Sequence, residues 1–323
     1  MAQRKLLAPI PTPEPAKFPY SDELPEGCRL IEETAPDWGC KVKIHTDVVY
    51  CERTDREGKP YPLKLQILEP GVPQGEPVWE VEKVRKWPCI VYVQGSAFHR
   101  QNIWYALPRH MRMAEHGYVV AIVEYRPSEV APFPAQMQDA KTAIRFMKKN
   151  AETYHIDPEH VALAGDSSGA HTALMAGFTG DEEPDTDVYS DYSASVNCIV
   201  DVYGPTVFAL MNYYDSSECH WLPDAPEGME LGGLNVLDHL DLADQTVPMN
   251  YLSPDKPTPP LLLFHGGRDR LVPFNQSVIL YETMKKLGKE VEFYKVANAG
   301  HGCMGFDNDT ISGIVLDFLG RHI

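Results

Sequence analysis

The chain has 323 residues, of which 43% are hydrophobic and 23% charged, a balance typical of a soluble globular protein with one well-buried core. Its formal net charge of −17 argues against nucleic acid or an anionic membrane surface as a partner, because phosphate binding needs an excess of Lys and Arg. No window approaches the roughly 18 uninterrupted apolar residues of a membrane span, and the seven cysteines show no C-x-x-C pairing, so we expect a cytoplasmic protein with reduced thiols and no metal site.

Residues 1–38 form a proline-rich arm, with prolines at positions 9, 11, 13, 15, 19 and 25. Proline favours extended or polyproline backbone, and it interrupts the N-terminal apolar run before that run reaches the length of a secretory signal. We expect the arm to be docked on its own domain or on a neighbouring subunit, and in the second case the protein is a homo-oligomer. Residues 39–323 contain no internal repeat, so we expect them to form one domain.

After the arm, strand and helix patterns alternate. Two β-rich stretches, 42–51 and 63–68, flank a turn-forming sequence and predict an antiparallel edge of a sheet. A continuous apolar run at 89–93 indicates a strand that is covered on both faces, and 118–125 is expected to be the next buried strand. A helix after residue 134 presents one apolar face, which is made by Ala140, Ala143, Ile144, Met147 and Ala151.

The next apolar strand, 161–164, runs through Gly165-Asp166-Ser167-Ser168-Gly169 into a helix of small residues. In this G-x-S-x-G sequence the central serine sits in a sharp turn, and the flanking glycines let strand and helix approach closely. Ser167 is therefore the candidate nucleophile. The backbone N–H of Ser168, at the start of the helix, is a candidate donor to a developing oxyanion.

A strand at 198–203 precedes a region, about 205–260, in which the hydrophobic period disappears and aromatic, Pro and Gly residues are frequent. An insertion of this length is typical of a cap or of binding loops. Regular patterns then return as a strand, a helix, a strand and a last amphipathic helix at 261–264, 275–287, 291–296 and 311–319. Strands that alternate with helices predict an α/β fold with a mostly parallel central sheet and helices on both faces.

Two later loops carry residues that complete a catalytic set with Ser167. Asp269 follows the strand at 261–264, and His301 lies in a loop of small residues after the next strand. A serine hydroxyl becomes a nucleophile at neutral pH only when an imidazole accepts its proton, so we expect His301 to be the general base and Asp269 to orient it. The order Ser, Asp, His along the chain is that of α/β-hydrolases.

The loop at 94–98 follows a buried strand and is expected to complete the site. Small residues there let backbone N–H groups point into a pocket, so we predict that Ser96 and Ala97 form an oxyanion hole together with Ser168. Aromatic residues of this loop and of the insertion are candidates for substrate contact. Among them we select Phe98 and Trp221 as substrate-binding residues.

Other acidic and histidine residues offer alternative roles. Asp201 ends a buried strand and is the rival acid, but Asp269 has the better loop context. Asp166, beside the nucleophile, is expected to be an orienting or solvated carboxylate. His171 lies on the helix after the nucleophile and is expected to be a packed structural residue, and His265 is expected to be a hydrogen-bonded anchor.

On these motifs the chain resembles the esterase/lipase superfamily of α/β-hydrolases from about residue 88 to the C-terminus. Within it, Val93-Gln94-Gly95-Ser96-Ala97-Phe98 is similar to the V-Q-G-S-G-W loop of bifunctional acetylxylan/feruloyl esterases. Further similar stretches lie at 133–136, 225–227, 231–233, 251–254 and 269–273. The resemblance implies hydrolysis of short or aromatic acyl esters of carbohydrates without a cofactor, with Ser167, Asp269 and His301 as the triad.

Three functional hypotheses are open at this stage. The first is a serine carboxylesterase that acts on acetyl or feruloyl esters of small molecules or oligosaccharides through an acyl-Ser167 intermediate. The second keeps the triad but changes the bond, as in an arylformamidase or amidase. The third is a non-catalytic binding protein with a hydrolase fold, which a missing triad residue would favour, but all three residue types are present in order.

Overall fold

The computed structural model describes residues 40–73, 85–186, 188–302 and 305–323. The proline-rich arm predicted at 1–38 lies outside these residues, as does any subunit contact made through it. Cys51, Cys89 and Cys198 are buried free thiols, and Cys219 is an exposed one. In the described part of the chain, no helix has the length and apolar character needed to cross a membrane.

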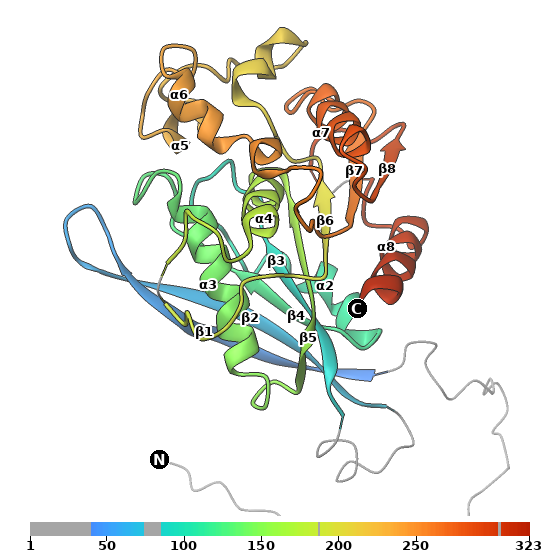
Figure 1. Ribbon diagram of the computed structural model, residues 1–323. Coiled ribbons are helices and arrows are strands. Elements are labelled where there is room, and N and C mark those ends of the chain that lie inside the picture. The colour runs from blue at the N-terminus through green and yellow to red at the C-terminus, as the bar shows by residue number, and fades with distance from the viewer. Residues whose placement is uncertain (1–39, 74–84, 187, 303–304) are drawn as a thin grey trace, which may run out of the picture. The chain divides into compact units, whose positions relative to one another are not determined.

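The described residues are built around an eight-stranded sheet with the order β1-β2-β4-β3-β5-β6-β7-β8 (Figure 1). β1 pairs with β2 and β2 with β4 in antiparallel fashion, whereas every later pair is parallel. The predicted antiparallel edge and parallel centre are thus both confirmed. The strands are β1 (Cys40–Thr54), β2 (Pro60–Pro73), β3 (Trp87–Val93), β4 (Val119–Val123), β5 (Ile156–Asp166), β6 (Cys198–Val202), β7 (Leu261–Gly266) and β8 (Val291–Val296).

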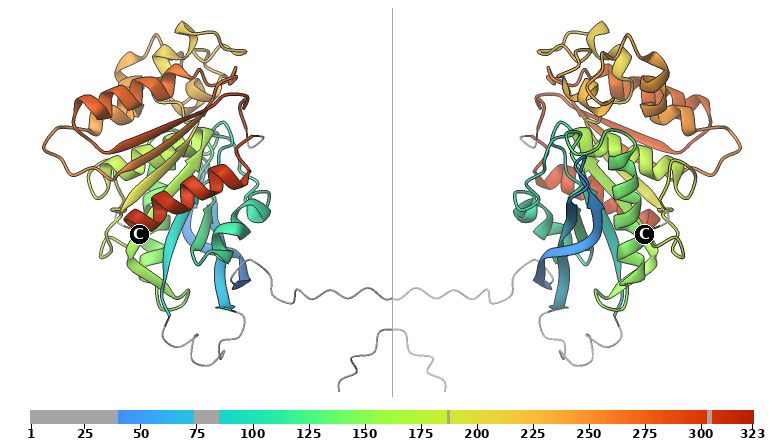
Figure 2. Two further views of the ribbon diagram at one scale, coloured as in Figure 1. Left: turned by 90° about the vertical axis from the view of Figure 1, so that its right-hand side faces the viewer. Right: turned by 90° about the vertical axis from the view of Figure 1, so that its left-hand side faces the viewer.

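Helices cover both faces of this sheet, as the two views of Figure 2 show. α3, α4 and α7 contribute to the hydrophobic cluster on one face, and α2 and α8 contribute to the cluster on the other. The long helices are α2 (Leu107–Glu115), α3 (Ala135–Lys149), α4 (Ser167–Thr179), α7 (Asn275–Lys286) and α8 (Asp309–His322).

The two clusters follow from the alternation of side chains along each buried strand. In β3, Cys89 and Val91 face the first cluster, whereas Ile90 and Tyr92 face the second. Because both faces are covered, the central strands are apolar at nearly every position. This explains why the sequence shows continuous apolar runs there instead of an alternating pattern.

Two helices illustrate how local sequence sets the element boundaries. The predicted apolar face of α3 is confirmed, but the helix ends at Lys149, so Ala151 lies in the turn that follows and is buried there. Lys148 and Lys149 occupy its last turn, where positive charge is favourable for the helix dipole. α8 begins after Asn308, whose Oδ1 accepts a hydrogen bond from the N–H of Ile311 at 3.1 Å.

The region between β6 and β7 consists of short helices that lie beyond the carboxyl ends of the parallel strands (Figure 1). It has a hydrophobic cluster of its own, which includes Phe208, Leu231, Val236 and Ala243 and also takes in Phe98 from the loop after β3. The short helices are η2 (Phe208–Tyr213), α5 (Pro226–Glu230), α6 (Leu240–Ala243), η3 (Asp244–Thr246) and η4 (Pro248–Tyr251). We refer to residues 204–260 as the insertion.

Candidate active site

The turn between β5 and α4 places Ser167 at the carboxyl edge of the sheet. Its backbone φ is 51°, a left-handed conformation that is strained for a residue with a side chain. A Cβ atom on Gly165 would lie 2.5 Å from the carbonyl oxygen of Gly169, and one on Gly169 would lie 2.1 Å from the carbonyl oxygen of Val93. Only glycine fits at these two positions, which is the steric basis of the G-x-S-x-G spacing.

The three residues predicted as a triad are joined by two hydrogen bonds. Ser167 Oγ lies 2.9 Å from His301 Nε2, and His301 Nδ1 lies 2.8 Å from Asp269 Oδ2. The side chain of Asp269 is fully buried, whereas His301 keeps 17% of its side chain exposed. The geometry lets His301 accept the serine proton on Nε2 while the carboxylate holds the proton on Nδ1.

The Asp269 carboxylate is surrounded by donors. Its Oδ1 accepts hydrogen bonds from the N–H groups of Leu271 at 2.9 Å and Val272 at 3.0 Å, and its Oδ2 also lies 3.4 Å from His265 Nε2. Burial alone would raise the pKa of this carboxyl, but the hydrogen bonds from His265 and His301 outweigh burial and lower the pKa well below its usual range. Asp269 is therefore ionised throughout the neutral range.

The loop after β3 presents backbone N–H groups near Ser167, but not all three predicted donors are equivalent. The N–H of Ser96 donates to Ser168 Oγ at 2.9 Å, so it is directed at that hydroxyl. Ala97 has a positive φ of 54° and lines the cavity at the site, and the N–H of Ser168 lies in the first turn of α4. An oxyanion hole made by Ala97 and Ser168 remains a prediction.

Asp166, next to the nucleophile, connects the turn between β5 and α4 to neighbouring segments. Its Oδ1 accepts hydrogen bonds from the hydroxyl of Tyr92 and from the N–H of Gly95 at 2.9 Å, and its Oδ2 lies 3.4 Å from the hydroxyl of Tyr203. It is a buried orienting carboxylate, as one of the two expected roles requires. Tyr203 also packs against His301, with ring centroids 4.7 Å apart.

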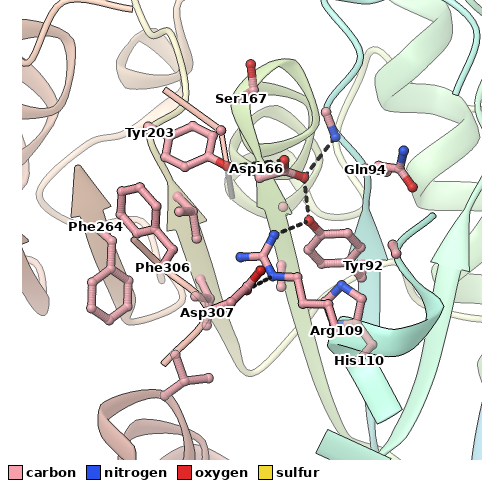
Figure 3. Close-up of a pocket in the computed structure, with 18 of the residues that line it drawn as sticks. Tyr92, Gln94, Arg109, His110, Asp166, Ser167, Tyr203, Phe264, Phe306 and Asp307 are labelled. Atoms are coloured by element: carbon pink, nitrogen blue, oxygen red, sulfur yellow. Dashed lines mark hydrogen bonds and ion pairs between the residues drawn. The ribbon is translucent and has the colours of Figure 1, made fainter. Parts of the chain in front are cut away.

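A cavity of about 910 Å³ extends from Ser167 and His301 along the face of the sheet that α2 and α8 cover. Figure 3 shows Arg109 of α2 between Tyr92 and Asp307, and an ion pair joins Arg109 Nε to Asp307 Oδ1 at 2.8 Å. Most of the cavity wall is apolar, with contributions from Ile90, Ala164, Val200, Val202, Phe264, Phe306, Val315 and Leu319. The cavity lies within the size range of sites for small organic ligands.

The two residues predicted to bind substrate lie elsewhere. Phe98 is only 1% exposed and packs against Phe208 of the insertion, because the positive φ of 59° at Phe98 places its side chain in that cluster. Trp221 packs on the same cluster, and its Nε1–H donates to the carbonyl of Ala209 at 3.1 Å. Neither residue lines the cavity at Ser167. Both side chains instead pack in the hydrophobic cluster that joins the loop to the insertion.

The histidine and acid alternatives occupy separate places. His171 Nδ1 lies 3.0 Å from the carbonyl of Pro205, and its buried ring packs against Phe208, as expected for a structural residue. His265 is anchored by the hydroxyl of Ser277 at 2.6 Å. Asp201 is fully buried at the end of β6, where its Oδ1 accepts the N–H of Gly204 at 2.9 Å. Burial raises the pKa of Asp201 to about 7.

Comparison with known proteins places the chain in a family. Residues 79–284, more than half of the chain, match the family described as BD-FAE. The chain belongs to this family. Among solved structures, it resembles a truncated form of a carbohydrate esterase from gut microbiota, with 26% identity, a TM-score of 0.69, and coverage of 89% of this chain and 98% of the other. It also resembles a bifunctional GH43-CE protein of Bacteroides eggerthii, with 26% identity, a TM-score of 0.72, and coverage of 86% of this chain and 38% of the other.

Curated relatives match over a shorter part of their own length. Esterase LipC of Mycobacterium tuberculosis is 25% identical over 223 residues, which are 67% of this chain and 53% of LipC. Esterase LipQ of the same organism is 26% identical over 244 residues, which are 73% of this chain and 56% of LipQ. The chain thus spans about half the length of these relatives. Together with the sheet order, the comparisons identify the fold as that of an α/β-hydrolase.

Proposed function

We propose that this chain is a serine carboxylesterase that works through an acyl-Ser167 intermediate. One observation carries the proposal: Ser167 stands in a strained turn at the carboxyl edge of the sheet and is hydrogen-bonded through His301 to the buried Asp269. Three side chains of these types in this order and contact activate a serine hydroxyl for acyl transfer. The BD-FAE family and the esterase names of the relatives support the same reaction class.

The proposed reaction has two halves. His301 Nε2 takes the proton of Ser167 as Oγ attacks the ester carbonyl, and the carbonyl oxygen becomes an oxyanion that backbone N–H groups stabilise. The C–O bond to the alcohol then breaks, and His301 returns the proton to the leaving alkoxide. In the second half a water molecule, deprotonated by His301, attacks the acyl-Ser167 ester. The bond from the acyl carbon to Ser167 Oγ then breaks, His301 returns the proton to Oγ, and the carboxylic acid is released.

For the substrate, we propose an aromatic or short acyl ester of a carbohydrate, as in feruloyl or acetyl esters. The carbohydrate-esterase titles of the two structural neighbours support this class. The cavity of about 910 Å³ favours the larger acyl group, because an acetyl group would leave most of it unfilled.

The first test compares methyl ferulate, an acetylated xylo-oligosaccharide and p-nitrophenyl acetate as substrates, with the Ser167→Ala variant as the blank. We expect turnover of at least the ferulate and its loss by more than about a thousandfold in Ser167→Ala. Full activity in that variant would overturn the proposed nucleophile. Turnover of only the activated p-nitrophenyl ester would keep the triad and remove the carbohydrate assignment.

A second test fills the cavity. Val315 lies in the cavity wall on α8, so Val315→Phe should lower kcat/KM for ferulate more than about tenfold and leave that for p-nitrophenyl acetate within about twofold. Thr310→Phe, on the exposed side of the same helix, is the matched control. If kcat/KM falls equally for both substrates, or falls for neither, the acyl group binds outside this cavity.

A further inference from the structure

A segment of the insertion lies against the loop that carries Asp269. The N–H of Ser217 donates to the carbonyl of Arg270 at 2.6 Å, and the hydroxyl of Ser216 donates to the carbonyl of Leu271 at 2.9 Å. His220 Nε2 reaches the same Leu271 carbonyl at 3.0 Å. These contacts join segments more than 50 residues apart in the sequence.

The first of these contacts holds one of the peptide groups that donate to Asp269. A peptide group is planar, so the carbonyl of Arg270 and the N–H of Leu271 move as one body. The insertion binds its carbonyl end through Ser217, and its N–H end donates to Asp269 Oδ1 at 2.9 Å. Fixing the carbonyl direction therefore fixes the direction of this donor.

The next peptide group repeats the arrangement. Its carbonyl, from Leu271, accepts hydrogen bonds from Ser216 and His220, and its N–H, from Val272, donates to Asp269 Oδ1 at 3.0 Å. Hydrogen bonds in a chain polarise one another, so a strong donor on the carbonyl makes the N–H a better donor to the carboxylate. The insertion thus binds the carbonyl end of both peptide groups whose N–H groups donate to Asp269 Oδ1.

His220 is itself fixed by Glu227, the second residue of the short helix α5. His220 Nδ1 lies 2.9 Å from Glu227 Oε2, and both residues are at most 3% exposed. Nδ1 faces a carboxylate, and Nε2 faces the Leu271 carbonyl and, at 2.8 Å, the Ser216 oxygen. Because the one hydroxyl proton of Ser216 goes to that carbonyl, the groups facing both ring nitrogens accept, so each nitrogen carries a proton. Burial would lower the pKa of His220, but the hydrogen bond and charge of Glu227 outweigh burial and raise it.

We propose that His220 and Glu227 act as a positioning pair for Asp269, because they hold the peptide group whose N–H donates to its carboxylate. The pair is buried and does not line the cavity, so its effect on the reaction passes through Asp269 and not through contact with substrate. This inference rests on the proposed role of Asp269 in orienting the general base. On this inference the insertion contributes to the reaction through Asp269, in addition to any contact that it makes with substrate.

The kinetic test is a double-mutant cycle. Glu227→Gln keeps the shape of the side chain and removes its charge, and we expect it to lower kcat for p-nitrophenyl acetate about tenfold while KM changes less than about twofold. In the Asp269→Asn background the same substitution should change the rate less than about twofold, because the residue through which it acts is already lost. The labelling rate of Ser167 by a fluorophosphonate keeps the slow variants measurable.

Asp224→Asn removes an exposed carboxylate of the insertion and is the matched control, expected to retain the parent kcat. Equal losses in the two backgrounds would overturn the proposal, since a purely structural role acts independently of Asp269. Thermal unfolding of each variant identifies any that fail to fold. If Glu227→Gln does so, Ser216→Ala, which removes one hydrogen bond to Leu271, should give the same pattern with a loss of about threefold.

A spectroscopic test separates this inference from the proposed function. We expect the proton between His301 Nδ1 and Asp269 Oδ2, which are 2.8 Å apart, to give a far-downfield proton NMR signal in the absence of substrate. We expect Glu227→Gln and His220→Gln to shift or broaden that signal and Asp224→Asn to leave it in place. An unchanged signal in a folded Glu227→Gln protein would refute the positioning pair. This outcome does not depend on whether the comparison with Ser167→Ala supports ester hydrolysis.

Discussion

Two buried carboxylates stand at the carboxyl ends of neighbouring strands and differ in what surrounds them. Asp269, in the loop after β7, receives two backbone N–H groups and lies against two imidazoles. Asp201, at the end of β6, receives the N–H of Gly204, and its Oδ2 has no partner among the described residues. Both side chains are shielded from solvent, so burial alone does not distinguish them.

The difference in partners decides the charge of each group. Desolvation favours the neutral acid in both places, and only donors or positive charge can reverse it. At Asp269 the donors prevail and the pKa is lowered, whereas at Asp201 a single N–H is not enough and the pKa is raised to about 7. A carboxylate that stabilises an imidazolium must be ionised, so Asp269 meets the electrostatic requirement for a catalytic acid partner, whereas Asp201, with a pKa of about 7, is only partly ionised at neutral pH.

The largest expected effect comes from replacing each acid by its amide. Asp269→Asn should lower kcat about ten-thousandfold, because an amide at this position favours the wrong tautomer of His301. Asp201→Asn should change kcat less than about threefold, since the Asp201 carboxyl accepts the N–H of Gly204, whereas His301 Nδ1 is hydrogen-bonded to Asp269. Steady-state kinetics on one ester at pH 7.5 measure both.

The contrast between the two acids is wrong if the effects of Asp269→Asn and Asp201→Asn on kcat are reversed or equal. A large loss in Asp201→Asn with a retained melting temperature would move the catalytic acid to β6. Near-normal activity in Asp269→Asn would show that the hydrogen bond from His301 Nδ1 to Asp269 is not needed for turnover.

The next effect is on the pH dependence of stability. Because the pKa of Asp201 is raised from 3.8 to about 7 on folding, the folded state binds more protons between these values, and its stability falls as pH rises through about 7. Asp201→Asn removes this loss, so the variant should gain relative to the parent protein between pH 5 and pH 8, by at most about 3 kcal/mol. Urea unfolding at the two pH values measures the gain.

Asp215→Asn, which changes an exposed carboxylate of the insertion, is the control for this measurement. The opposite sign is expected at Asp269, where a lowered pKa contributes stability that is present above the unfolded value and lost as pH falls through the folded value. If Asp201→Asn shows the same stability difference from the parent at pH 5 and pH 8, Asp201 is already ionised in the folded protein, and the contrast between the two acids disappears.

The sequence predicted those parts of the site that depend on local geometry. The turn that carries Ser167 could be located because the strand, the glycine spacing and the helix occur within about ten residues, and each follows from short-range sterics. Asp269 was preferred to Asp201 because it follows a buried strand, in a loop that can hold a carboxylate against an imidazole. The order of strands and helices was likewise predictable, because the buried strands are mostly apolar.

What could not be predicted depends on contacts between distant segments. The burial of Phe98 depends on a positive φ that no local pattern in an Ala-Phe sequence signals. The contact of His220 with Leu271 spans 51 residues, and the similarity of 225–227 to known esterases marked Glu227 without indicating its partner. The cavity lies between α2, α8 and the sheet, and its volume depends on helix packing that periodicity does not determine.

The smallest expected effect concerns the space around the two acids. A Cβ atom on Gly204 would lie 3.0 Å from both Asp201 Oδ1 and the Cβ of Ala170, whereas one on Gly300, in the loop before His301, would meet only the carbonyl of Arg268 at 3.8 Å. Gly204→Ala should therefore destabilise the protein by about 1 to 2 kcal/mol, and Gly300→Ala by less than about 0.5 kcal/mol. Urea unfolding at pH 7 compares them. Equal stabilities would mean that the end of β6 yields to the added methyl group, and the two acids would then not differ in how closely their surroundings are packed.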